Sequence, residues 1–202
     1  SYFSAGLKRM STDARIVIVL PAYNAARTLE KTYADIPKEK IYKIILVDDV
    51  SQDRTVEVAH ALGLSVVIHI QNRGYGGNQK TCYIEALKEG ADVVVMLHPD
   101  HQYDSKLVPE LVEPILSGRA DMVIGSRILN GCALEGGMPF WKFVANRALT
   151  IAENLVYGTN LTDGHSGFRA YSRRFLTTVP FLLNSDDFVF DSQMIAQAAY
   201  LG

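Results

Sequence analysis

The sequence lacks long hydrophobic runs and has only two cysteines. An apolar run such as Val93–Leu97 is far shorter than the ~20 residues that cross a bilayer. Residues 1–12 contain no long apolar stretch and do not match a signal peptide. Cys82 and Cys132 form neither a metal-type cluster nor a disulfide framework. The sequence therefore shows no membrane-spanning helix, no signal peptide and no disulfide-stabilised fold.

The sequence also has no large excess of positive or negative charge. Its 20 Lys and Arg nearly balance its 22 Asp and Glu, for a net charge of −2. A nucleic-acid-binding domain carries a clear basic excess, so we expect no nucleic-acid partner. With 202 residues, of which 48% are hydrophobic and 21% charged, the chain has the composition of one soluble globular domain with a substantial core.

The two ends of the sequence differ in character. We expect residues 1–13 to be a flexible leader or extension, and residues 14–202 to form one domain. The apolar stretch Met194–Leu201 runs to the end without a helix-stop signal. We therefore expect the domain to be incomplete at Gly202. The lack of a membrane segment in this sequence then says nothing about the whole protein.

Short apolar runs alternate with helical patterns along most of the chain. Strands are predicted at 16–20, 44–47, 66–70, 93–97 and 122–124, and helices at 26–36, 55–62 and 78–89. After residue 131 the alternation is weaker, with a helix predicted at 140–157, a strand at 168–171 and a helix at 192–201. The strands are apolar throughout, as in sheets covered on both faces. The pattern predicts an α/β fold with a mostly parallel central sheet between helical layers.

Polar residues follow several of these strands, and parallel strands place their carboxyl ends at one edge, where ligands bind. The segments are Pro21-Ala22-Tyr23-Asn24, Asp48-Asp49, His98-Pro99-Asp100-His101-Gln102 and Gly125-Ser126-Arg127. Their carboxylates could bind a ribose, a base edge or a cation, and Arg127 could bind phosphate oxygens.

Each of these segments also has a purely structural interpretation. Asp53, before Thr55, is favoured as a helix cap, and Asn24 could cap the first helix. Asp48 and Asp49 could lie in a solvated loop. His98 and His101 could be surface or supporting residues. The recurrence of polar groups at successive strand ends favours a binding site.

Six motifs in order resemble family 2 glycosyltransferases of the GT-A fold, a three-layer α/β/α sandwich. The resemblance is greatest to the branch with dolichyl-phosphate mannosyltransferase and bacterial polyprenyl-phosphate glycosyltransferases. It covers residues 14–202 and includes Val19–Asn24, Val47–Thr55, Asn72–Asn78, His98–Gln102, Gly125–Arg127 and Ser166–Tyr171.

The resemblance implies an inverting transferase that moves a sugar from a nucleotide-diphosphate sugar, such as a UDP- or GDP-sugar. The residues that it implies for nucleotide-sugar binding are Pro21, Tyr23, Asn24, Asp48, Asp49, Gly76, His98 and Asp100. Its metal site, for Mg²⁺ or Mn²⁺, falls on His98, Asp100 and Gln102. Arg127, Arg147, Ser166 and Arg169 are implied for phosphate or acceptor contacts.

The chain departs from the family pattern at several positions. His98 stands where the Asp-x-Asp motif has its first Asp, and neutral imidazole is a poor ligand for Mg²⁺ but an acceptable one for Mn²⁺. Asp100 is the carboxylate that remains. Val50 and Arg54 stand where small or glycine residues are usual.

The acceptor decides which catalytic groups are needed. A polyprenyl or dolichyl phosphate, the acceptor that the resemblance implies, attacks with an oxygen that is already ionised. A hydroxyl acceptor needs a base, for which Asp163 and Asp191 are candidates. The other candidate catalytic residues are Asp100, through the metal, and Arg127, through the phosphate. Asp163 could instead lie in a turn, and Asp191 could cap the last helix. A lipid acceptor implies a cytoplasmic protein at the cytoplasmic face of a membrane.

Three other functions compete with sugar transfer. Gly74–Thr81 resembles the phosphate-binding loop of nucleotide hydrolases, with Gln79 in place of the last glycine. A dinucleotide-dependent oxidoreductase fails because no Gly-x-Gly-x-x-Gly follows the first strand. A non-catalytic nucleotide-sugar-binding domain is compatible with the loss of the motif's first Asp at His98.

Overall fold

The computed structural model describes residues 13–125 and 166–201. Within these ranges six strands form one sheet in the order β3-β2-β1-β4-β6-β5. The strands are β1 (Ile16–Ala22), β2 (Ile41–Asp48), β3 (Ser65–Ile68), β4 (Val93–Leu97), β5 (Met122–Ile124) and β6 (Phe168–Ser172). Strands β1 to β4 pair in parallel, whereas β6 pairs antiparallel with both β4 and β5. Strand β5 therefore runs in the same direction as β1 to β4, and the mostly parallel sheet is confirmed.

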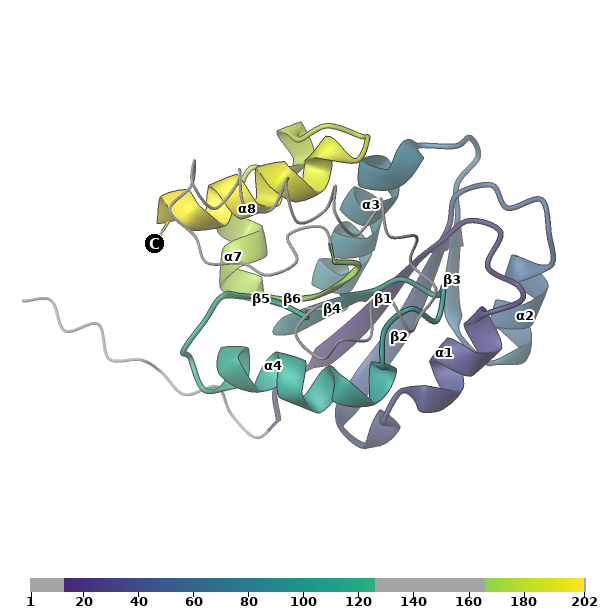
Figure 1. Cartoon of the computed structure of the whole chain (residues 1–202), viewed down its shortest axis with the longest axis horizontal. Coiled ribbons are helices and arrows are strands. Elements are labelled where there is room, and N and C mark those ends of the chain that lie inside the picture. The colour runs from purple at the N-terminus through teal and green to yellow at the C-terminus, as the bar shows by residue number, and fades with distance from the viewer. Residues whose placement is uncertain (1–12, 126–165, 202) are drawn as a thin grey trace, which may run out of the picture.

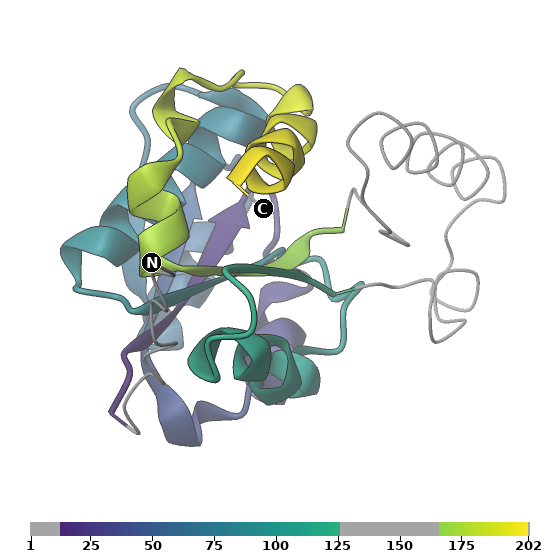
Figure 2. The same ribbon diagram turned by 90° about the vertical axis from the view of Figure 1, so that its left-hand side faces the viewer.

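Helices cover both faces of this sheet, as Figures 1 and 2 show. The helices are α1 (Leu29–Asp35), α2 (Thr55–Ala61), α3 (Gly74–Lys88), α4 (Val108–Leu116), α7 (Arg173–Thr178) and α8 (Val189–Leu201). Short 3₁₀ turns lie at Lys38–Lys40, Ser105–Leu107 and Phe181–Leu183. Leu29 of α1, Ala59 of α2 and Val112 of α4 share one core cluster with Ile18 and Leu20 of β1.

The opposite face carries a second core cluster. Tyr83 of α3, Phe175 of α7 and Met194 of α8 pack with Val17 and Val19 of the same strand. Alternate residues of β1 thus enter opposite layers, as the two-residue period of a strand requires. All seven residues of β1 are buried. The architecture is the predicted three-layer α/β/α sandwich.

Helix boundaries differ from the sequence prediction where local bonds intervene. Helix α1 begins at Leu29 rather than residue 26, because the carbonyl of Ala25 first accepts the amides of Thr28 and Leu29 in a turn. Helix α3 begins at Gly74 rather than Asn78, since the Asp186 carbonyl accepts the amide of Gly76. Helix α4 was not predicted. It contains Pro114, which usually interrupts a helix because it lacks an N–H.

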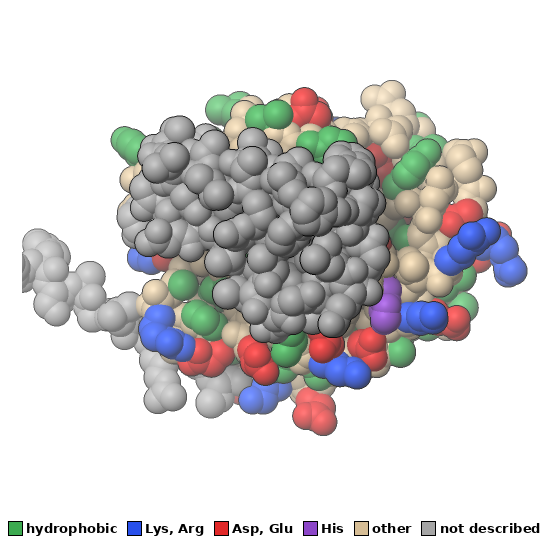
Figure 3. All heavy atoms as spheres, viewed as in Figure 1, with side chains coloured by type: hydrophobic (Ala, Val, Ile, Leu, Met, Phe, Trp, Pro, Cys, Tyr) green, Lys and Arg blue, Asp and Glu red, His purple; other side chains and the backbone are tan. Residues whose placement is uncertain are grey.

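In the part of the chain that the structure describes, no helix is both long and apolar enough to cross a bilayer. Figure 3 shows basic and acidic side chains interspersed along the visible lower edge of the molecule. This mixture agrees with the nearly balanced charge of the sequence.

Candidate functional site

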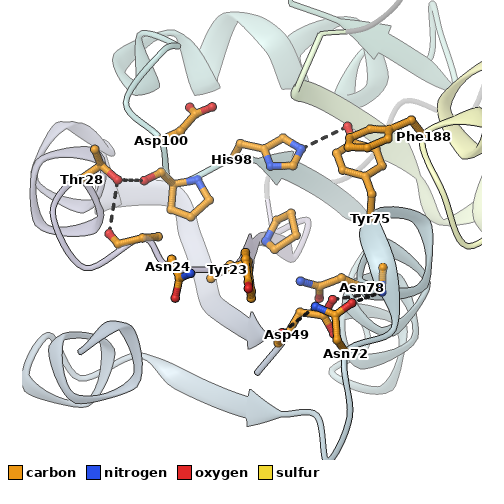
Figure 4. Close-up of a pocket in the computed structure, with 15 residues that line it drawn as sticks. Tyr23, Asn24, Thr28, Asp49, Asn72, Tyr75, Asn78, His98, Asp100 and Phe188 are labelled. Atoms are coloured by element: carbon orange, nitrogen blue, oxygen red, sulfur yellow. Dashed lines mark hydrogen bonds between the residues drawn. The ribbon is translucent and has the colours of Figure 1, made fainter. Parts of the chain in front are cut away.

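A pocket of about 400 Å³ lies at the carboxyl ends of β1, β2 and β4 (Figure 4). Its walls come from the segment after β1, the end of β2, the start of α3, the segment after β4 and Phe188. The lining residues are Pro21, Ala22, Tyr23, Asn24, Ala25, Thr28, Asp49, Asn72, Gly74, Tyr75, Asn78, His98, Pro99, Asp100 and Phe188. The edge of the sheet predicted to bind a ligand is therefore the edge that carries this pocket.

The segment after β1 is tied to the segment after β2. The amide of Asn24 donates to Ser51 Oγ over 2.8 Å, and Asn24 Oδ1 accepts the Gln52 amide over 2.7 Å. Asn24 therefore links two loops rather than capping α1, whose cap residue is Thr28. Tyr23 lines the pocket and is 57% exposed, so its ring is available to a ligand.

Asp53 supports the same two loops. It accepts hydrogen bonds from the Thr55 amide, the Thr55 hydroxyl and the Ala26 amide. Its slight burial acts to raise its pKa, but these hydrogen bonds hold the pKa below the ordinary value. Asp53 thus binds the first turn of α2, close to the favoured interpretation as a cap, and also anchors the start of the segment that leads to α1.

Asp48 and Asp49 are both buried but have different partners. Asp48 Oδ2 accepts the Ser51 amide over 3.0 Å, while its buried Oδ1 has no hydrogen-bond partner. Asp49 Oδ1 accepts from the Arg73 amide over 2.8 Å, and Oδ2 accepts from the Gly74 amide over 3.1 Å. Asp49 lines the pocket, but its carboxylate accepts hydrogen bonds from the segment that leads into α3. The solvated-loop alternative is wrong for both, since they are 1% and 4% exposed.

His69 contacts the pocket residue Asp49 through a side chain that is only 7% exposed, and the sequence interpretation missed it. Its Nδ1 lies 2.7 Å from Asp49 Oδ1, and its Nε2 lies 2.9 Å from Thr81 Oγ1. The signal was present, because His69 directly follows β3 as Asp49 follows β2, and the two strands are neighbours.

Backbone strain gathers at the same edge of the sheet. Asn24, Val50 and His101 have φ values of 53°, 65° and 58°. They follow β1, β2 and β4. Positive φ is costly for residues with a Cβ and most of all for a β-branched residue such as Val50. Such strain persists where the surrounding structure enforces it, which is common at ligand-binding sites.

The motif after β4 spreads its side chains in different directions. His98 stacks on Tyr75, with its Nε2 3.3 Å from the tyrosine hydroxyl. Asp100 is exposed, and its Oδ1 accepts the Gln102 amide over 3.0 Å. Figure 4 shows the His98 ring directed toward Tyr75 and the Asp100 carboxylate directed elsewhere. His101 Nε2 lies 3.1 Å from Asp35 Oδ2, so this histidine joins the segment after β4 to α1.

Asp100 is the exposed carboxylate on which a metal site in this pocket would have to be built. Residues 13–125 and 166–201 contain no group of three His, Cys, Asp or Glu side chains that could hold a metal ion by itself. His98 and Asp100 do not converge, and Gln102 is exposed. Asp100 fits a cation whose other ligands come from a bound diphosphate, because such ions retain few protein ligands.

The glycine-rich segment is part of α3 and not a phosphate-binding loop. Its amides at Gly76 and Gly77 donate to the Asp186 carbonyl over 2.8 and 3.3 Å. A Cβ on Gly76 would lie 2.4 Å from the Ser185 carbonyl oxygen. These contacts argue against the nucleotide-hydrolase alternative, because the amides of Gly76 and Gly77 are already bonded and cannot bind phosphate. Gly76 packs against the segment before α8 and does not line the pocket.

Arg169 and Asp191 form a buried ion pair behind the pocket wall, 2.8 Å apart and 0% and 3% exposed at the side chain. Asp191 also accepts from Tyr75 over 2.8 Å and from Gln79 over 3.1 Å. Burial and the nearby Asp191 charge raise the pKa of Tyr75 well above its ordinary value, so its hydroxyl stays a donor. This environment argues against Asp191 as a base and Arg169 as a phosphate contact. Asp191 does not cap α8 either, since Asp187 accepts the Val189 amide.

Ser166 is buried and donates to the Gly125 carbonyl, which joins the residues that flank 126–165. Its hydroxyl is therefore already used between two backbone segments. Arg127, Arg147 and Asp163, with the predicted helix at 140–157, lie outside the described residues.

Comparison with known proteins agrees with this architecture. Residues 17–179 match the model of glycosyl transferase family 2. A hexosyltransferase of low-salt glycan biosynthesis, Agl6 of Haloferax volcanii, is 35% identical over 94% of this chain and 46% of its own length. An uncharacterized protein of Methanocaldococcus jannaschii is 34% identical over 91% of this chain and 75% of its own length. The chain therefore spans less than half of the Haloferax relative.

A third relative is the UDP-N-acetylglucosamine–dolichyl-phosphate N-acetylglucosaminyltransferase of Methanococcus voltae. It is 29% identical over 80% of this chain and 70% of its own length. Among solved structures, glucosyl-3-phosphoglycerate synthase of Mycobacterium tuberculosis with phosphoglyceric acid has a TM-score of 0.71 at 26% identity. That match covers 92% of this chain and 68% of the synthase.

The family match begins one residue into β1 and continues past β6, so it includes the carboxyl ends of β1, β2 and β4 that carry the pocket. It confirms the GT-A architecture and the enzyme class that the sequence predicted. This chain is a glycosyltransferase domain and belongs to glycosyl transferase family 2.

Proposed function

We propose that this domain transfers a hexose from a UDP- or GDP-sugar to a polyprenyl or dolichyl phosphate, with inversion at the anomeric carbon. The observation that carries the proposal is the pocket that joins Tyr23, Asn24 and Asp49 to His98 and Asp100. The aromatic and amide groups suit a nucleoside, and the segment after β4 suits its diphosphate. The volume of about 400 Å³ is in the range of pockets for small ligands.

Named relatives support this choice of acceptor. The Methanococcus voltae relative acts on dolichyl phosphate by its name, as does the dolichol-phosphate mannosyltransferase of Pyrococcus furiosus, which is 29% identical over 77% of this chain. An undecaprenyl-phosphate mannosyltransferase of Micrococcus luteus is 28% identical over 93% of it. With such an acceptor the protein would act at the cytoplasmic face of a membrane.

In the proposed reaction an ionised oxygen of the acceptor phosphate forms a bond to the anomeric carbon. The bond from that carbon to the nucleoside diphosphate breaks, and its electron pair leaves with the diphosphate. No proton has to be removed, which suits a pocket where Asp49 is already hydrogen-bonded to backbone amides. Arg127 and Arg147 are retained as candidate phosphate ligands, whereas the buried Arg169 is left out of this role.

Asp100 is proposed to hold a divalent cation together with the donor diphosphate. When bound, Mg²⁺ or Mn²⁺ would neutralise charge on the leaving group. Glucosyl-3-phosphoglycerate synthase, which is similar to this chain in fold, has been crystallised with Mn²⁺ and UDP-glucose. Asp100 would bind the ion and also orient the diphosphate, while His98 keeps its contact with Tyr75.

The experiment compares acceptors with one labelled donor set. UDP- and GDP-hexoses are incubated with dolichyl phosphate, with dolichol, or with 3-phosphoglycerate, in the presence of Mn²⁺ or Mg²⁺. We expect a lipid-extractable product with dolichyl phosphate, of opposite anomeric configuration to the donor. Transfer to dolichol or 3-phosphoglycerate instead would contradict the proposed acceptor. Donor binding without transfer to any of the three would favour the non-catalytic alternative.

A further inference from the structure

We propose that His69 is a positioning residue for the nucleotide-sugar pocket. It fixes the carboxylate of Asp49 and thereby the chain at Arg73 and Gly74, which leads into the pocket residue Tyr75. The assignment of a ligand to this pocket rests on the proposed function. The arrangement of the wall itself rests on the contacts of His69.

The Asp49 carboxylate has a demanding set of partners. Oδ1 accepts from His69 Nδ1 over 2.7 Å and from the Arg73 amide over 2.8 Å, while Oδ2 accepts from the Gly74 amide over 3.1 Å. The backbone carbonyl of Asp49 accepts from Asn72 Nδ2 over 3.1 Å. The carboxylate and the backbone carbonyl of Asp49 together therefore define the course of residues 72–74. A carboxylate can rotate about its side-chain bonds, so its orientation needs a further fixed donor.

His69 is that fixed donor because both ring nitrogens are held. Asp49 Oδ1 is an acceptor, so Nδ1 of His69 carries a proton. Nε2 lies 2.9 Å from Thr81 Oγ1, so the second ring nitrogen is held as well. Thr81 is on α3, Asp49 follows β2 and His69 follows β3, so the ring joins three elements. The side chains of His69 and Asp49 are only 7% and 5% exposed.

The order Asp49, His69, Thr81 has the hydrogen-bond pattern of a nucleophilic triad. Thr81 is 8% exposed within helix α3 and does not line the pocket. Its hydroxyl also lies 3.3 Å from the Gly77 carbonyl. A nucleophile must reach the substrate, so a catalytic role for Thr81 is excluded. The hydrogen bonds of His69 can instead hold the Asp49 carboxylate in a fixed position relative to α3.

The segment that His69 organises is largely exposed, and its Gly74 amide is shared between Asp49 Oδ2 and Asn72 Oδ1, the latter over 3.0 Å. Ile70 is 102% exposed, and Gln71 and Asn72 are exposed as well. The chain then turns at Gly74, whose φ is 78° and whose Cβ would lie 2.7 Å from the Asp186 carbonyl oxygen. The turn must therefore keep a narrow conformation directly before Tyr75. The bonds from Asp49 to Arg73 and Gly74 hold it there.

The experiment uses two amide side chains that separate the bonds of His69. The nitrogen of Asn occupies nearly the place of Nδ1, and the nitrogen of Gln nearly that of Nε2. His69→Asn should keep the bond to Asp49 and leave UDP or GDP affinity within about twofold of the wild type. His69→Gln should lose this bond and weaken nucleotide affinity about tenfold, as expected for a lost buried hydrogen bond to a charged group.

Amide hydrogen exchange supplies the readout that tests positioning itself. His69→Gln should speed exchange at Arg73 and Gly74, and His69→Asn should leave it slow. In transfer assays the Gln variant should raise the donor KM with little change in kcat. The matched controls are His60→Asn and His60→Gln on the exposed surface of α2, which should change neither property.

The same loss in both His69 variants would overturn the proposal, as would no loss in either. If neither variant folds, Thr81→Val tests the same chain of bonds from its other end. It should speed exchange at Arg73 and Gly74, and unchanged exchange there would also contradict the proposal. Nucleotide affinity and amide hydrogen exchange can both be measured without any sugar transfer. A chain that binds UDP but transfers no sugar would therefore contradict the proposed function and leave this test valid.

Discussion

The hydroxyl oxygen of Tyr75 lies 3.3 Å from Nε2 of His98, and the two rings stack with centroids 5.4 Å apart. Because the same hydroxyl donates to Asp191, its oxygen accepts from His98, which places a proton on Nε2. A protonated ring nitrogen does not bind a metal. His98, which replaces the first Asp of the family motif, thus uses its Nε2 to bond Tyr75 in the pocket wall.

Tyr75→Phe should lower the free energy of unfolding by about 1.5–3 kcal/mol, because the buried Asp191 carboxylate loses one donor while the ring stack is kept. Urea denaturation measures the change. Tyr33→Phe on α1 is the control and should stay within about 0.5 kcal/mol of the wild type. Equal stability of Tyr75→Phe and wild type would show that the hydroxyl does not support Asp191.

Arg169→Met should be strongly destabilising, by about 3–5 kcal/mol, because it leaves the Asp191 charge without its partner in the core. Arg169 is fully buried, and the pair distance is 2.8 Å. The double variant Arg169→Met with Asp191→Leu should recover much of this loss, since no buried charge then remains. A double variant that is less stable than Arg169→Met would contradict this account of the pair.

Val50→Gly should stabilise the domain, by about 1 kcal/mol, through release of backbone strain. Val50 has a φ of 65°, in the region that glycine adopts freely. The comparison is Val58→Gly inside α2, which should destabilise by more than about 1 kcal/mol, because helix propensity and the packing of Val58 on the core are both lost. Denaturant midpoints of both variants give the answer. A loss of stability on Val50→Gly would mean that contacts of the valine side chain outweigh the strain.

Asp53→Asn should reduce stability near neutral pH and flatten its decline in acid. The pKa of Asp53 is held below its ordinary value by hydrogen bonds. Its contribution is therefore present above the unfolded pKa of about 3.9 and is lost as pH falls through the lower folded value. Melting temperatures from pH 7 to pH 2.5 test this for both proteins. Parallel curves would rule out a contribution from the Asp53 carboxylate.

The sheet could be predicted from the sequence because its strands are short, apolar and separated by helical patterns. The bounds of β4 and β5 were predicted to the residue. The position of β6 between them could not be, because it depends on pairing with β4 across a long separation in the chain. The start of α3 depends in the same way on the Asp186 carbonyl, more than a hundred residues away.

The position of the pocket was predictable, whereas the contacts that each of its residues makes were less so. Polar groups at the strand ends do converge on one pocket, as the order β2-β1-β4 requires. The sequence could not show that Asp49 bonds the amides of α3, or that Arg169 and Asp191 pair in the core. Charged residues in a motif look alike in sequence, and only packing decides whether they face a ligand or each other.

The measurement that tests the central claim most directly is sugar transfer by Asp100→Ala, with Asp104→Ala as the matched control. Asp100 lines the pocket, whereas Asp104 lies four residues later and accepts the Lys106 amide outside it. We expect Asp100→Ala to fold normally and to lose at least about 99% of transfer, as when one preorganised electrostatic group is removed from an active site. Asp104→Ala should keep most of it. Near-normal transfer by folded Asp100→Ala would contradict the claim that this pocket is the catalytic site.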